Sequence, residues 1–201
     1  MLRNLLIISL FLSLPAAALA KKRTLPIENV TSIADLIVAG EIVSVENNVC
    51  QFKIAETIKG KSPAIITVQQ FKEWTCDVRY AKAAKGQQLF LFLKKVNGKL
   101  ELVNGSTGEL AVINNKVTLA SESQDLGCYQ SPPYQLSIEE FSAGIKGFIH
   151  LFAIIDNNNE GKRAYFLQKG TEKDLEKFIA AGSFSKWLYE KLHRNYKIIK
   201  S

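Results

Sequence analysis

Short apolar runs separated by turn residues fill the first half of the chain. Cys50, Phe52 and Ile54 are apolar, and polar residues stand between them at positions 51 and 53. This period of two is typical of a strand with one face in a core. The preceding run, 35–46, is apolar at both parities in its first half, which predicts burial on both faces. A third run, 64–71, is rich in Ile, Thr and Val, which favour strands.

Turn residues punctuate these runs and predict an antiparallel meander. Asparagine and glycine tolerate the positive φ that tight hairpins need, and proline interrupts strands. A fourth strand is expected over 87–95, and shorter strands over 100–103, 110–113 and 117–120. The turn signals between the strands are Asn47-Asn48, Lys59 to Pro63, Asn97-Gly98 and Asn114-Asn115.

The fourth strand needs a cover, because residues 89–93 read LFLFL without a polar interruption and are expected to be buried on both faces. The sequence Ser-Ile-Glu-Glu at 137–140 is a capping box that predicts the start of a helix. Apolar residues then repeat at helical spacing, so we expect this helix to cover the strand. They are Phe141, Ile145, Phe148, Ile149 and Phe152.

Two more helices are predicted towards the C-terminus. The first begins at Thr171 and the second carries apolar residues on one face. Residues 164–168 fit either a strand or a helical turn, and 73–86 is expected to be a loop with a short helix over 80–85. The apolar faces are Leu175, Phe178 and Ile179 in the first helix, and Phe184, Trp187, Leu188 and Leu192 in the second.

Residues 1–20 have the three parts of a secretory signal peptide. Arg3 supplies the positive region, residues 5–14 are apolar, and Ala18-Leu19-Ala20 is an A-x-A cleavage site. Cleavage is therefore predicted between Ala20 and Lys21. A membrane anchor is disfavoured, because the apolar run is shorter than the ~20 residues of a membrane span. We expect a secreted or periplasmic protein.

Three segments resemble the netrin-module or TIMP-like family. They read ADLIVAGEIV at 34–43, FKIAETIKG at 52–60 and GQQLFLFL at 86–93. This resemblance covers residues 34–120 and implies an OB-type five-stranded barrel, a fold that many secreted bacterial proteins of this family share. We therefore expect a mainly β protein with C-terminal helices. An OB-like five-stranded antiparallel barrel would occupy 21–130, and a helical extension over 131–201 would pack on it.

The resemblance also raises protease inhibition as an alternative. Family inhibitors of metalloproteases place a cysteine at the mature N-terminus, where its amine and carbonyl chelate the zinc of the target. The predicted mature N-terminus of this chain is Lys21-Lys22-Arg23, which has no such cysteine. The alternative is therefore an inhibitor-like protein without that mechanism.

Three cysteines remain, and an exported chain lies where disulfides persist. Cys50 lies on the apolar face of its predicted strand, which indicates a small core residue. Cys76 and Cys128 lie in polar, irregular segments. We therefore predict a Cys76–Cys128 disulfide. No two cysteines have C-x-x-C spacing, which argues against a zinc ribbon or a thioredoxin-type pair.

The basic excess of the predicted mature chain lies in its tail. Residues 161–201 hold 10 Lys and Arg against 4 Asp and Glu, whereas 21–160 hold 15 of each. A basic amphipathic helix with a tryptophan could lie on an anionic membrane or an acidic partner. The other interpretation is a docked helix with a solvated lysine face. The candidate face comprises Lys186, Trp187, Lys191, Arg194 and Lys197.

Few residues suit catalysis. Ser183 and Lys186 have the S-x-x-K spacing of serine acyl-transferases, but the companion motifs S-D-N and K-T-G are missing. His150 and His193 are the only histidines, and no nearby cysteine or carboxylate pattern suggests a triad or a metal site. We expect no enzyme activity, no cofactor and no metal.

The favoured hypothesis is a secreted, non-catalytic, monomeric binding module that presents barrel loops to a protein or glycan partner. The alternative is an envelope protein held on an anionic membrane by its basic C-terminal helix. An enzyme with a site assembled from loops stays a third hypothesis. Nucleic acid is not an expected partner, because the strands lack the aromatic and basic interleaving that single-strand binding needs.

Overall fold

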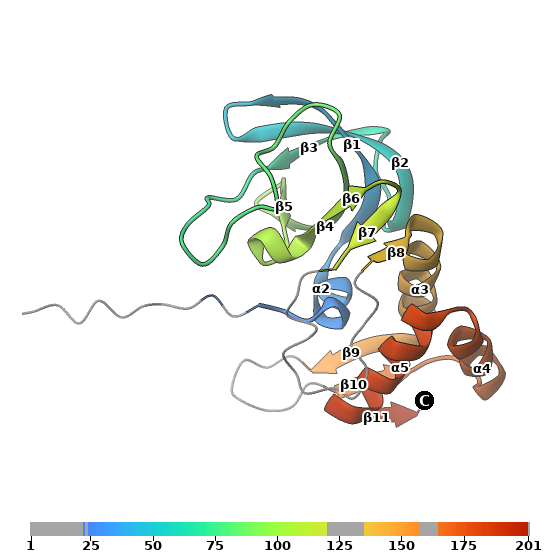
Figure 1. Ribbon diagram of the computed structural model, residues 1–201. Helices are drawn as coiled ribbons and strands as arrows, with labels where there is room; N and C mark the ends of the chain where they lie inside the picture. The colour runs from blue at the N-terminus through green and yellow to red at the C-terminus, as the bar shows by residue number, and fades with distance from the viewer. Residues whose placement is uncertain (1–21, 23, 120–134, 157–164, 201) are drawn as a thin grey trace, which may run out of the picture.

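A closed barrel of five strands forms one end of the molecule, and helices with a small second sheet form the other (Figure 1). The structure is a computed structural model that describes residues 22, 24–119, 135–156 and 165–200. The barrel strands are β1 (Leu36–Glu46), β2 (Val49–Lys59), β3 (Ile65–Gln69), β4 (Gln88–Val96) and β5 (Lys99–Leu102).

The strand order is β1-β2-β3-β5-β4, and pairing of β4 with β1 closes the barrel. The predicted five-stranded barrel is confirmed, but it is mixed and not wholly antiparallel. Strands β3 and β5 run parallel and pair at Val68 with Leu100 and at Gln69 with Glu101. A closed ring with an odd number of strands cannot alternate direction throughout, so one neighbouring pair must be parallel.

The hairpin turns lie where the sequence predicts them. Both central residues have positive φ in each turn, as type I′ hairpins require. The values are 44° and 64° at Asn47-Asn48, 49° and 78° at Asn97-Gly98, and 51° and 59° at Asn114-Asn115.

Strand β4 is buried on both faces, as predicted. Leu89, Leu91 and Leu93 belong to the core inside the barrel, whereas Phe90 and Phe92 belong to a second core that the helices complete. Helix α3 (Ile138–Leu151) supplies the cover. The ring centroid of Phe141 on this helix lies 5.0 Å from that of Phe90 and 6.5 Å from that of Phe92.

The start of α3 follows the predicted capping box only in part. Ser137 Oγ accepts a hydrogen bond from the backbone N–H of Glu140 at 3.1 Å. The Glu140 carboxylate turns to the start of another helix, where Oε1 accepts from Ser183 Oγ at 2.8 Å and from the Phe184 N–H at 3.2 Å. One side chain thus fastens two helices together.

Three short strands and a 3-10 turn extend the barrel sheet beyond β4. Strand β6 pairs with β4, β7 pairs with β6, and β8 pairs with β7 just before α3 begins. These elements are η1 (Gly105–Gly108), β6 (Glu109–Ile113), β7 (Lys116–Thr118) and β8 (Gln135–Ser137).

The C-terminal region contains the expected helices and, in addition, a three-stranded sheet. Phe152, predicted as the last apolar residue of the helix, begins β9. Residues 164–168, which fit either a strand or a helical turn by sequence, contain the strand β10. Strand β10 pairs antiparallel with β9 and parallel with β11. The elements are β9 (Phe152–Asp156), β10 (Tyr165–Gln168), α4 (Glu172–Ala180), α5 (Ser183–Asn195) and β11 (Lys197–Lys200).

Helix α2 (Ile27–Ile33) was not predicted, and it packs beside α3 and β9 although it precedes the barrel in the chain. Val30 and Ala34 join the second core with residues of the C-terminal helices. The predicted boundary at residue 130 lies outside the described residues. Among the helices of the described segments, none is long and apolar enough to cross a bilayer.

Candidate functional site

Residues 70–87, the connection from β3 to β4, gather exposed apolar side chains. Trp74, Val78 and Tyr80 are 43%, 60% and 70% exposed. In the part of the chain that the structure describes, the other exposed large hydrophobic side chains lie on four different strands, at Val45, Ile65, Ile155 and Ile199. Single exposed apolar residues are ordinary, whereas clusters mark interaction surfaces. We call residues 70–87 the β3–β4 loop.

The tip of the β3–β4 loop is a tight turn. The backbone N–H of Trp74 donates to the carbonyl oxygen of Asp77 at 3.2 Å, and the N–H of Asp77 donates back to Trp74 at 2.8 Å. This ladder pairing fixes the chain on both sides of Cys76. The helix predicted over 80–85 is not formed, because these residues run as bends and turns.

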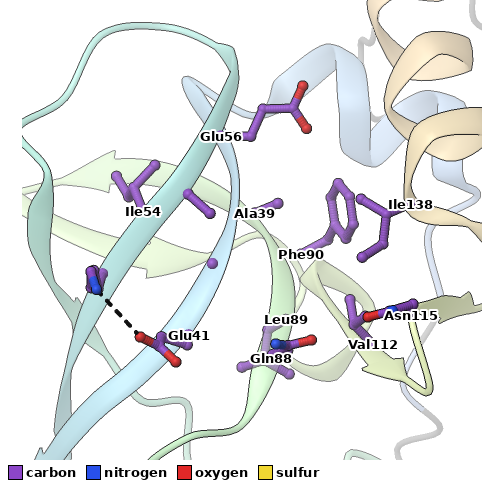
Figure 2. A pocket seen from close by; sticks show the side chains of 13 residues that line it. Ala39, Glu41, Ile54, Glu56, Gln88, Leu89, Phe90, Val112, Asn115 and Ile138 are labelled. Carbon is purple, nitrogen blue, oxygen red and sulfur yellow. Dashed lines mark ion pairs between the residues drawn. The ribbon is translucent and has the colours of Figure 1, made fainter.

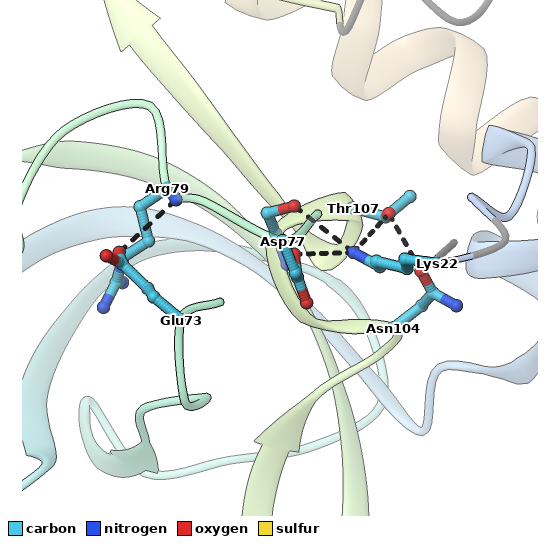
Figure 3. A network of polar contacts seen from close by, with 7 residues as sticks. Lys22, Glu73, Asp77, Arg79, Asn104 and Thr107 are labelled. Atoms are coloured by element: carbon cyan, nitrogen blue, oxygen red, sulfur yellow. Dashed lines mark hydrogen bonds and ion pairs between the residues drawn. The ribbon is translucent and has the colours of Figure 1, made fainter. Parts of the chain in front are cut away.

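Asp77 is the first anchor of the loop (Figure 3). Its Oδ1 accepts from Lys22 Nζ at 2.7 Å and from the Ser106 N–H at 3.0 Å. Lys22 Nζ also donates to the hydroxyl of Thr107 at 3.3 Å. Burial raises the pKa of Asp77, but the hydrogen bonds from Lys22 and Ser106 outweigh burial and hold this pKa below its ordinary value. The carboxylate is therefore charged at neutral pH.

The close approach of Asp77 depends on a glycine. Gly105 has a φ of +57°, and a Cβ at this position would overlap the Oδ2 atom of Asp77. Only glycine adopts this backbone conformation readily and leaves room for the carboxylate.

Arg79 is the second anchor. Its side chain forms a buried ion pair with Glu109 at the start of β6, with Nε donating to Oε1 at 3.0 Å. Nη1 donates to Gln70 Oε1 at 3.0 Å, and the guanidinium carbon lies 5.6 Å from the ring centroid of Phe71. Burial raises the pKa of Glu109 against the attraction of Arg79. The pair joins the middle of the loop to β6, which pairs with the barrel strand β4.

The cysteines divide as the sequence analysis expects. Cys50 is buried in the barrel core, and burial raises the pKa of its thiol, so it is a packing residue. Cys76 is exposed at the tip of the loop and is not bonded to another cysteine in the structure. Cys128 lies outside the described residues, so the Cys76–Cys128 disulfide stays a prediction. The same holds for cleavage between Ala20 and Lys21.

A pocket of about 290 Å³ lies where the barrel meets the start of α3 (Figure 2). Leu89, Phe90 and Ile138 contribute to its apolar lining, and Glu56 lies at its rim. The volume is at the lower end of the ~300–1,000 Å³ range of small-molecule sites. The pocket could therefore hold a small apolar group.

Glu56 itself serves as a fastening between β2 and α3. Its carboxylate accepts from Ser142 Oγ at 2.7 Å and from Lys146 Nζ at 2.6 Å. Burial raises the pKa of Glu56, but the contacts with Lys146 and Ser142 outweigh it and keep this pKa below its ordinary value.

The predicted basic face is formed only in part on α5, and Lys197 lies on β11. Lys186, Arg194 and Lys197 are exposed, but Trp187 and Lys191 are only 5% and 4% exposed and lie in the interior. Trp187 and Lys191 are one helical turn apart, so they share the face of α5 that packs inward. The interpretation of α5 as a docked helix with solvated lysines is the one that holds.

Lys191 can be buried because a distant carboxylate neutralises it. Its Nζ lies 2.7 Å from Oε2 of Glu28 on α2, and the hydroxyl of Tyr196 donates to the other carboxylate oxygen at 2.8 Å. Lys191 Nζ also lies 4.8 Å from the ring centroid of Trp187. A buried charge needs such partners. Glu28 and Lys191 are 163 positions apart, so the sequence gives no local sign of the pair.

The histidines and the Ser183–Lys186 pair, which the sequence offers as candidate catalytic residues, form no common site in the described residues. His150 is exposed on α3, and His193 is exposed on α5, where its Nδ1 lies 3.1 Å from the carbonyl oxygen of Tyr189. The Ser183 hydroxyl donates to Glu140, as described above, and Lys186 points to solvent. Within the described segments, no group of three His, Cys, Asp or Glu residues is arranged to hold a metal ion.

No family model matches the chain, and no curated protein matches it. The resemblance to the netrin-module or TIMP-like family stays a prediction.

Proposed function

We propose that this protein is a non-catalytic binding module that attaches to a partner surface through the β3–β4 loop. The observation that carries the proposal is the exposure of Trp74, Val78 and Tyr80 on one loop that ion pairs with Lys22 and Glu109 hold in place. Tryptophan and tyrosine contribute large contact areas and are enriched among the residues that dominate binding energy.

The anchors of the loop support this proposal. Lys22 holds Asp77, and Glu109 holds Arg79, so the exposed side chains project from a fixed backbone. A surface that is ordered before binding loses little conformational entropy when a partner arrives.

Export remains part of the proposal, and the signal-like residues 1–20 support it. The sequence offers a protein, a glycan or an anionic membrane as the partner. Attachment to an envelope membrane by α5 loses its support, because Trp187 and Lys191 are buried.

Site-specific photocrosslinking tests the proposal. A benzoylphenylalanine is introduced at Val78 in the loop, or at Ile155 on β9 as a control of similar exposure, 60% against 52%. In the producing cell, we expect adducts from position 78 and none from position 155. An absence of adducts at 78, or equal adducts at both positions, would overturn the proposal.

A further inference from the structure

We propose that the partner of the β3–β4 loop is an anionic lipid surface, an inference that rests on the proposed function above. The exposed side chains of the loop combine the two chemistries that a membrane interface selects. Trp74, Val78 and Tyr80 supply apolar and amphipathic groups, and lysines stand among them in the sequence. The exposed lysines are Lys72, Lys82 and Lys85.

The exposed charge of the loop is positive. Asp77 and Arg79 are buried and paired with Lys22 and Glu109, so neither contributes a free charge at the surface. The remaining exposed charges are the three lysines and Glu73. Their net charge is +2, because three positive groups face one negative group. Such a surface is complementary to anionic headgroups.

Lysine and aromatic groups favour a lipid partner over a protein partner. Tryptophan and tyrosine concentrate at the membrane–water interface, where the ring meets the acyl boundary and the polar atom stays hydrated. Basic residues near an anionic leaflet add attraction, and their long stems reach the headgroups while the apolar part stays buried. Protein interfaces, in contrast, are depleted in lysine at their cores.

The position of the loop permits contact with a flat surface. Figure 1 shows the β3–β4 connection projecting from the side of the barrel away from α3, α4 and α5. The tight turn from Trp74 to Asp77 holds the tip in shape. The apolar groups can therefore enter the interface while the helical end of the molecule stays in water.

The test measures binding of the full chain to vesicles of phosphatidylcholine with and without phosphatidylglycerol. We expect co-sedimentation only with phosphatidylglycerol, and weaker binding at higher salt because ions screen exposed charges. The chain has two tryptophans, and Trp187 is buried. A blue shift of the emission on vesicle addition therefore reports Trp74, and W74F should abolish it.

Two loop variants and a matched control locate the surface. K72Q/K82Q/K85Q should lower the partition coefficient by roughly 100-fold at low salt. W74S/V78S/Y80S should lower it by at least roughly tenfold. K94Q/K95Q/K99Q makes the same charge change on the β4–β5 hairpin and should stay within roughly threefold of wild type. All these positions are exposed, so the variants should keep the thermal stability of wild type.

Residues 1–20 are present in every variant, so their contribution to vesicle binding cancels when the partition coefficients of the variants are compared. No binding to phosphatidylglycerol vesicles, or equal binding of wild type and both loop variants, would overturn the inference. Adducts from position 78 with protein or glycan alone, together with no vesicle binding, would overturn the lipid assignment and leave the binding module standing. No adducts and no vesicle binding would overturn both.

Discussion

Asp77 and Arg79 are two positions apart, yet each fastens the β3–β4 loop to a different part of the molecule. Asp77 meets Lys22, which lies 55 positions earlier, and Arg79 meets Glu109, which lies 30 positions later. Each charge has a partner because burial without one would be costly. The sequence shows the charged residues but not these pairings, so the anchors could not be predicted.

Replacing Asp77 with asparagine should destabilise the protein in a pH-dependent way. The carboxylate accepts hydrogen bonds from a lysine and a backbone N–H, so D77N should lower the free energy of unfolding by roughly 1.5–3 kcal/mol at neutral pH. The pKa of Asp77 in the folded protein is below its ordinary value of 3.8. Its stabilisation is therefore complete above the ordinary pKa and is lost as the pH falls through the folded value.

Urea unfolding of wild type and D77N at several pH values measures this difference. We expect it to be constant from neutral pH to about pH 5 and to shrink below about pH 4. E46Q, at an exposed position on β1, serves as the control and should change the free energy of unfolding by less than about 0.5 kcal/mol. A difference that grows towards acid pH would contradict the expected direction of the pKa shift.

At the scale of elements, α3 shows what sequence pattern can establish. Its start and its role as a cover for β4 are confirmed, and Phe141, Ile145 and Phe148 face inward as predicted, whereas Phe152 belongs to β9. The hairpins are confirmed too, because asparagine and glycine at positive φ are local signals. In contrast, β11 pairs with β10 across the two intervening helices α4 and α5, and such short strands do not reveal their pairing in the sequence.

Phe141 is the residue through which α3 holds the barrel, so its removal tests the cover. Its side chain is fully buried, and its ring lies close to those of Phe90, Phe92 and Phe184. F141A should lower the free energy of unfolding by about 3–5 kcal/mol, because burial is lost and a cavity remains. Chemical denaturation measures this loss. E139A, at an exposed position on the same helix, should have little effect, and similar losses in both variants would show that the cover is not specific.

At the scale of the whole molecule, the candidate binding surface was predicted only as a loop. The charge and the tryptophan of the C-terminal helix favour a binding face there, yet Trp187 and Lys191 of that face are buried. Trp74, Val78 and Tyr80 share the parity of a strand face, a pattern that would favour their burial, yet the structure exposes them and buries Asp77 and Arg79 instead. The pattern of apolar and polar residues predicts the strands and helices of the fold better than it predicts which side chains form a binding surface.

The disulfide prediction depends on the prediction that the chain is exported. We expect Cys76 to pair with Cys128 and Cys50 to stay a free thiol, because Cys50 is buried and Cys76 is exposed. Closing this loop should add about 4 kcal/mol to the free energy of unfolding in the chain-entropy model. Non-reducing peptide mapping identifies the pair, and unfolding of C76S/C128S against C50S measures the effect. A disulfide that includes Cys50 would show the assignment to be wrong.

The ion pair between Glu28 and Lys191 has a consequence for biogenesis. Its members lie near opposite ends of the described chain, so the pair cannot form until α5 has been synthesised, although α2 can already contact α3 and β9. In a nascent chain still emerging from the ribosome, the Glu28 carboxylate has no Lys191 to pair with. Burial of this carboxylate, and with it completion of the native state, must wait until the last residues have been synthesised.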